Sequence, residues 1–216
     1  MSSPLTVTEL RSLLAARFPE RHRKSSGAVA TGVRSLDDAL GGGLPVGRLT
    51  ELVSATLGSG GQTVVAEILR ATRRARQRVA LIDGANGFVA EAVPPDCLRH
   101  LVWVRAHNAG EAFAAADILV RDGNYAVVML DLRGLAERTL LKTAATVWHR
   151  LRHATESSPS AVLVQTTTGL VPTVPCRLVL RTPQPLTQRR TVRAALADAF
   201  VVEVERARVD ALEKIA

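Results

Sequence analysis

The sequence predicts an α/β domain built on a mostly parallel, twisted sheet with helices on both faces. Apolar residues make up 47% of the 216-residue chain and aromatic residues only 3%, so the core must consist mainly of aliphatic side chains, as in buried parallel sheets. From Arg48 onward, short apolar runs typical of buried strands alternate with longer segments of helical periodicity. This alternation favours right-handed strand–helix–strand units around one core.

Each expected element follows from its local pattern. Continuous apolar runs predict core strands at residues 48–54, 78–83, 101–105, 125–132 and 161–166. Apolar residues at three- and four-residue spacing predict helices at 63–77, 109–121 and 135–153. After Pro175, turn-rich sequence separates shorter apolar runs at 177–181, 191–195 and 200–205, which predict a short antiparallel C-terminal extension of the sheet.

The chain divides into an N-terminal arm, residues 1–27, and one α/β domain, residues 28–216. The arm places apolar side chains near helical spacing, at Leu5, Leu10, Leu13, Leu14 and Phe18. Pro19 ends this run, and a basic linker follows. We expect the apolar stripe to dock on its own domain, on another protein or on a neighbouring copy, so self-association through the arm is a candidate role.

Positive charge predominates. Twenty-eight Lys and Arg residues against twenty Asp and Glu give a net charge of +8, and Arg far exceeds Lys, which suits contacts with phosphate groups. Two basic clusters are candidate contacts for DNA or a partner protein: Arg70, Arg73 and Arg74, and Arg189 with Arg190. The alternative is a solvated basic surface, because aromatic residues do not interleave with these arginines.

The sequence gives little support for a metal-binding, membrane-spanning or secreted protein. Cys97 and Cys176 lie far apart with no CxxC or Cys/His spacing near them, so we expect buried free thiols and no metal site. No apolar run approaches the length of a membrane span, and Met1-Ser2-Ser3-Pro4 does not resemble the start of a signal peptide. We therefore expect a cytoplasmic protein without a membrane partner.

Residues 31–52, TGVRSLDDALGGGLPVGRLTEL, resemble the segment that leads into the P-loop of RecA-family recombinases. The resemblance implies a RecA-like core and a nucleotide-binding loop at the next residues, of which Ser59, Gly60, Gly61, Gln62 and Thr63 match the loop's end. Gln62 stands where the family has the phosphate-binding lysine, and Thr56 where it has the first glycine. A neutral amide cannot supply the charge that holds and stabilises the β- and γ-phosphates, so we expect a vestigial loop.

Three further regions of the sequence bear on whether ATP could be hydrolysed. Asp131 ends an apolar strand like the acidic residue that orients magnesium in such proteins; the alternative, which we favour, is that it caps a helix or pairs with Arg133. Ala85 and Asn86 occupy the region of the catalytic glutamate, and Asp83 is expected to be a turn residue instead of a base. Gln165 resembles the glutamine that reports nucleotide state in RecA.

A RecA-like core with these substitutions resembles ImuA-type proteins. The resemblance implies a non-catalytic adaptor in SOS-induced translesion DNA synthesis, which binds RecA or subunits of a mutagenic polymerase complex. We expect no catalytic residues and no cofactor, with ATP and magnesium bound at most weakly. Two alternatives stay open: an ATPase whose missing charge comes from Arg133 or Lys142, and a DNA-binding module that uses the Arg-rich faces.

Overall fold

Seven strands form the central sheet, in the order β5–β4–β6–β7–β3–β8–β9. The computed structural model describes residues 27–55, 59–181, 197 and 199–207. The strands are β3 (Leu49–Val53), β4 (Val79–Asp83), β5 (Leu101–Arg105), β6 (Val127–Asp131), β7 (Ala161–Thr166), β8 (Cys176–Leu180) and β9 (Val202–Ala207). All neighbouring pairs are parallel except β8 and β9, which are antiparallel. The predicted fold class, an α/β domain with a RecA-like core and a short antiparallel extension, is therefore confirmed.

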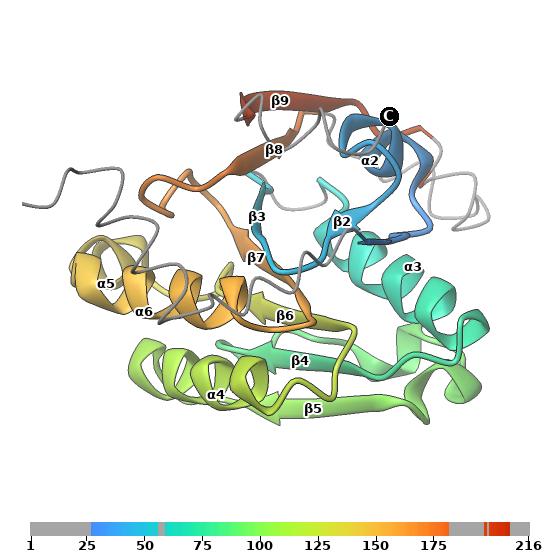
Figure 1. Cartoon of the computed structure of the whole chain (residues 1–216), viewed down its shortest axis with the longest axis horizontal. Coiled ribbons are helices and arrows are strands. Elements are labelled where there is room, and N and C mark those ends of the chain that lie inside the picture. Colours follow the sequence, from blue (N-terminus) through green and yellow to red (C-terminus); the bar gives the residue numbers. More distant parts are fainter. Residues whose placement is uncertain (1–26, 56–58, 182–196, 198, 208–216) are drawn as a thin grey trace, which may run out of the picture.

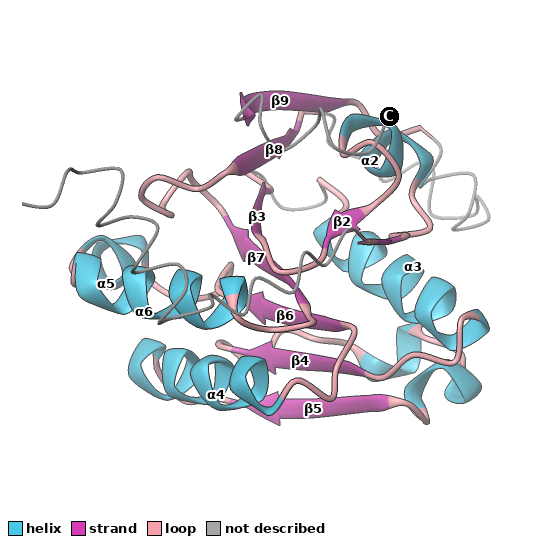
Figure 2. Ribbon diagram, in the orientation of Figure 1, coloured by secondary structure: helices cyan, strands magenta, loops and turns pink. Residues whose placement is uncertain are grey.

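Helices cover both faces of this sheet (Figures 1 and 2). They are α2 (Arg34–Ala39), α3 (Gly61–Arg74), α4 (Ala109–Asp122), α5 (Glu137–Leu141) and α6 (Ala145–Glu156), with the short 3₁₀ helices η1 (Ala90–Ala92) and η2 (Pro95–Leu98). A separate two-stranded antiparallel sheet pairs β1 (Ala28–Val29) with β2 (Leu44–Pro45). The sequence pattern did not predict this small sheet, because each of its strands has only two residues.

Two apolar clusters form the core, one on each face of the sheet. The first packs α3, through side chains such as Val64 and Ile68, against Leu52, Leu81 and Met129. The second packs α4 and α6 against the opposite face and includes Phe113 and Trp148, whose rings meet edge to face with centroids 4.7 Å apart. The aliphatic side chains thus form two packed apolar layers, with the sheet between them.

One predicted helix is wrong in its extent. The pattern predicts a single helix at 135–153, whereas the structure has α5 and α6, separated at Lys142–Ala144. α5 ends at Leu141, and the backbone of Ala144, with ψ of 140°, is not helical, so α6 begins as a separate helix at Ala145. Apolar periodicity continues across the break, with Leu140 and Trp148 both buried, and no glycine or proline marks it.

The C-terminal extension matches the expectation in the part of the chain that the structure describes. β9 pairs antiparallel with β8, with a register shift between Arg177 and Leu178. The predicted strand at 191–195, the arm at 1–26, and Arg189 and Arg190 lie outside the described residues. Within the described ranges, no helix is long and apolar enough to span a bilayer.

Candidate functional site

The turn from β3 into α3 occupies the position predicted for the vestigial nucleotide-binding loop. β3 ends at Val53, and the N–H group of Ser54 then donates to the carbonyl of Thr166 on β7, 2.8 Å away. Gly60 has φ of +97°, a left-handed conformation that suits glycine, and α3 begins at Gly61. The strand–turn–helix arrangement is thus retained, and the helix N-terminus lies at the carboxyl edge of the parallel strands.

Gln62, at the position of the missing lysine, is engaged with a neighbouring loop. Its side-chain amide donates to the carbonyl oxygen of Gly87, with Nε2 and O 2.8 Å apart. Gly87 belongs to the loop that follows β4. The side chain at this position therefore links two loops of the sheet edge, and it contributes no positive charge to the start of α3.

Arg133, in the turn after β6, brings a positive charge to the start of α3. A Cβ atom placed on Gly61 would collide with Nη1 of Arg133 and would lie 3.1 Å from Oγ of Ser54. The guanidinium group is therefore packed directly on the first residue of the helix. It comes from the turn after β6, and a helix in which Gly61 carried a side chain would exclude it.

The charge of Arg133 is already paired. Its Nε donates to Oδ1 of Asp131 at 2.8 Å, its Nη2 donates to Oδ2, and its backbone N–H donates to Oδ1 at 3.1 Å. The side chains of Asp131 and Arg133 are 8% and 16% exposed. Both carboxylate oxygens are engaged in a bidentate pair, so the structure supports the pairing expected for Asp131 over a free magnesium ligand.

Phe200 covers the other glycine of the turn. A Cβ atom on Gly60 would collide with the aromatic ring of Phe200, which is 5% exposed and lies just before β9. An apolar ring thus lies against the backbone that cradles phosphate in an active P-loop. Together with Arg133, it fills the approach to Gly60 and Gly61 with groups of the protein itself.

Gln165 and Ser54 place buried polar atoms beneath the start of α3. In the sheet register, Gln165 lies beside Asp131 on one side and Leu52 on the other, so these side chains share the face that α3 covers. Gln165 is fully buried, and its two amide atoms and Oγ of Ser54 have no hydrogen-bond partner among the described residues. We call the group Ser54, Gly60, Gly61, Asp131, Arg133, Gln165 and Phe200 the strand-end site.

Asp83 acts as a turn residue, as the sequence predicts. Its carboxylate accepts from the backbone N–H groups of Ala85, Gly87 and Phe88, at 3.3, 2.9 and 2.9 Å. The side chain is buried and holds the loop that Gln62 also contacts. This role leaves Asp83 without the freedom to activate a water molecule.

A buried ion pair that the sequence analysis missed fixes the loop after Gln165. Glu51, fully buried in the middle of β3, accepts from Nε of Arg177 at 2.7 Å, from the hydroxyl of Thr166 and from the N–H groups of Leu170 and Val171. One carboxylate thereby ties this loop to two strands. The available signal was an acidic residue inside an otherwise apolar strand, which requires a buried cationic partner.

The arginines predicted as contacts lie apart from the strand-end site. Arg73 forms a bidentate pair with Asp96, at 2.8 and 2.9 Å, and Nε of Arg70 is 3.5 Å from the carboxylate of Glu67. Arg74 is exposed at the last position of α3 and forms no ion pair with another described residue. Of the predicted arginines that the structure describes, only Arg74 therefore presents an unpaired charge.

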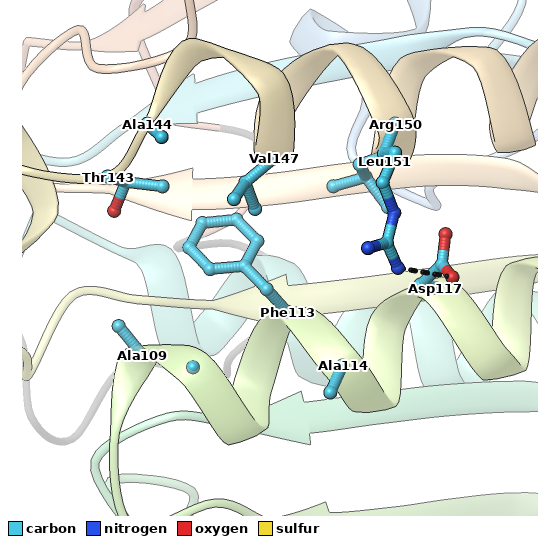
Figure 3. A pocket seen from close by; sticks show the side chains of 10 residues that line it. Ala109, Phe113, Ala114, Asp117, Thr143, Ala144, Val147, Arg150 and Leu151 are labelled. Atoms are coloured by element: carbon cyan, nitrogen blue, oxygen red, sulfur yellow. Dashed lines mark hydrogen bonds and ion pairs between the residues drawn. The ribbon is translucent and has the colours of Figure 1, made fainter.

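A hollow of about 340 Å³ lies between α4 and α6, on the face of the sheet opposite α3 (Figure 3). Phe113 points from α4 toward Val147 of α6, and small residues surround it on α4. The ion pair between Arg150 and Asp117, with N and O 2.9 Å apart, crosses from one helix to the other. This hollow is apolar and carries no group with obvious catalytic chemistry.

At the strand-end site, a strand–turn–helix backbone is packed by side chains that contact one another. Thr63 and Asp131 are the positions at which the sequence resembles a magnesium site, but Asp131 is bound to Arg133, and position 62 carries glutamine instead of lysine. In the described part of the chain, no group of three or more His, Cys, Asp or Glu side chains is placed to hold a metal ion. A comparison with models of known protein families finds none that matches this chain.

Proposed function

We propose that this protein is a non-catalytic adaptor with a RecA-like core, which acts in damage-induced translesion DNA synthesis by binding RecA or subunits of a mutagenic polymerase complex. The observation that carries the proposal is the position of Arg133. Its guanidinium group lies on Gly61 and is neutralised by Asp131. The nucleotide loop is thereby occupied by the protein's own side chains.

This arrangement opposes nucleotide chemistry for two physical reasons. An incoming triphosphate would have to displace the Arg133–Asp131 pair and the Phe200 ring from the start of α3. It would then meet Gln62 in place of the lysine whose charge stabilises phosphoryl transfer. A core that keeps its shape without this reaction is suited to presenting surfaces to other proteins, and the resemblance to ImuA-type proteins supplies the class of partner.

The alternative of a working ATPase has one observation in its favour. Arg133 brings a cation to the start of α3, as required if another residue replaced the missing lysine. Arg133→Ala separates the two proposals. A working ATPase would lose nucleotide affinity in this variant, whereas the adaptor would bind RecA or polymerase subunits equally well with and without Arg133.

The direct test measures partner binding. Purified protein is mixed with RecA filaments assembled on single-stranded DNA with a non-hydrolysable ATP analogue, and separately with mutagenic polymerase subunits. We expect one of these to retain the protein under salt conditions that remove nonspecific ionic contacts. Retention by neither, together with ATP hydrolysis that Asp131→Ala abolishes, would overturn the proposal.

A further inference from the structure

Three exposed arginines gather where α3 ends and β4 begins. Arg74 is the last residue of α3, Arg76 lies in the following turn, and Arg78 immediately precedes β4. Because β4 begins at the amino edge of the parallel strands, this corner lies at the edge opposite the strand-end site. We call Arg74, Arg76 and Arg78 the amino-edge arginines.

The amino-edge arginines differ from their neighbours in having no internal partner. Within the described ranges none of the three forms an ion pair, whereas Arg73, one position before Arg74, is held by both carboxylate oxygens of Asp96. The carboxylate of Asp96, on η2, is therefore already paired with Arg73. Arg74, Arg76 and Arg78 thus leave the corner with positive charge that no described acidic side chain pairs.

Arg76 occupies an unfavourable backbone conformation. Its φ is +57°, and around it the N–H of Gln77 donates to the carbonyl of Thr72 at 2.9 Å and the N–H of Arg76 donates to that of Arg73 at 3.2 Å. This is the helix ending at which glycine is favoured, since a Cβ atom strains the left-handed conformation. A strained, exposed residue with a charged side chain at such a position points to a use for that side chain.

The scaffold beneath these arginines is held by side-chain contacts. Arg73 ties the last turn of α3 to η2, and His100, just before β5, lies 3.0 Å from the hydroxyl of Thr72. Burial is the main factor that lowers the pKa of His100, and the charge of Arg73 lowers it further. A neutral imidazole therefore fits this contact, and the corner is a fixed platform for the three charges.

We propose that the amino-edge arginines form a contact surface for the phosphate backbone of double-stranded nucleic acid, without sequence preference. The planar guanidinium group matches phosphate geometry. None of the described aromatic side chains is exposed, so the surface lacks the stacking platform of single-strand binders. This surface is separate from the strand-end site, and the adaptor role does not depend on it.

The test uses the full chain, a fluorescent 20-base-pair DNA duplex of random sequence, and the variant Arg74→Gln/Arg76→Gly/Arg78→Gln. Glycine at position 76 suits the left-handed backbone, so the variant retains its fold. We expect at least about tenfold weaker binding at low salt, and a slope of log affinity against log salt that is smaller by about 2–3 in magnitude.

A matched variant, Arg34→Gln/Arg138→Gln/Lys142→Gln, removes three exposed cations elsewhere on the surface and should keep wild-type affinity. Equal losses in both variants, or no loss in the first, would overturn the proposal. Polyglutamate at the same charge concentration serves as an acidic-protein probe. If it bound more tightly than the duplex and lost more affinity in the amino-edge variant, the surface would belong to an acidic protein partner instead.

Discussion

The two edges of the parallel sheet use their charges in opposite ways. At the carboxyl edge, Asp131 and Arg133 satisfy each other, and Asp83 holds its own loop. At the amino edge, the amino-edge arginines are exposed and unpaired among the described residues. The charges of Asp131 and Arg133 at the carboxyl edge are thus paired with each other, whereas those of the amino-edge arginines are free among the described residues. Charges with internal partners should therefore matter for stability, and those without should not.

The largest effect is expected at the buried pair of Glu51 and Arg177. Glu51→Ala leaves the Arg177 guanidinium, 17% exposed, with only the more distant carboxylate of Glu205, 3.9 Å away, and should lower the free energy of unfolding by about 3 kcal/mol. Urea denaturation followed by circular dichroism measures this change. The exposed pair of Arg181 and Glu203 provides the control, since solvent screens this pair and Glu203→Ala should cost far less. Similar losses in the two variants would contradict the account of Glu51.

A smaller loss is expected at the strand-end site. Asp131→Ala leaves Arg133 unpaired against Gly61 and should lower the free energy of unfolding by about 2 kcal/mol, since the pair is only partly screened by solvent. Arg133→Ala and the double variant complete a mutant cycle. We expect a clear favourable coupling energy between the two residues. Additive effects would show that the bidentate contact does not hold the site closed.

At the amino edge, one substitution should stabilise the protein instead of destabilising it. Arg76→Gly removes the strain of a left-handed residue with a Cβ atom and should raise the free energy of unfolding by about 1 kcal/mol. Arg76→Ala keeps the Cβ atom and removes the same charge, so it should show no such gain. A glycine variant less stable than wild type would mean that Arg76 has a structural partner after all.

The smallest effect concerns acid stability. The pKa of His100 is lowered from its ordinary value of 6.5, first by burial and then by Arg73, so the unfolded chain binds a proton more readily than the folded one. Stability should therefore be greatest above that value and should fall as the pH drops below it toward the folded pKa. His100→Gln should flatten this part of the stability profile.

The sequence predicted the fold well because its strongest signals are local. Apolar strand runs and helical periodicity located all seven strands of the central sheet and the helices α3 and α4 to within a few residues. The break between α5 and α6 was missed because Lys142–Ala144 contains no residue that forbids a helix. The strands β1 and β2 were missed because two-residue strands carry no periodic signal.

The strand-end site was only partly predictable. The substitution at Gln62, the turn role of Asp83 and the pairing of Asp131 with Arg133 follow from local sequence. The contact of Arg133 with Gly61 depends on how β6 and α3 lie in space, and that of Phe200 with Gly60 joins residues 140 positions apart. Glu51 and Arg177 are likewise distant in sequence, so their pairing required the strand order.

The most direct test of the central claim is a titration of the protein with a fluorescent ATP analogue in the presence of magnesium. Because Arg133 and Phe200 occupy the start of α3 and Gln62 replaces the lysine, we predict no saturable binding up to millimolar analogue, for wild type and for Arg133→Ala alike. Magnesium-dependent binding at micromolar analogue, lost in Asp131→Ala, would show instead that the loop still serves a nucleotide.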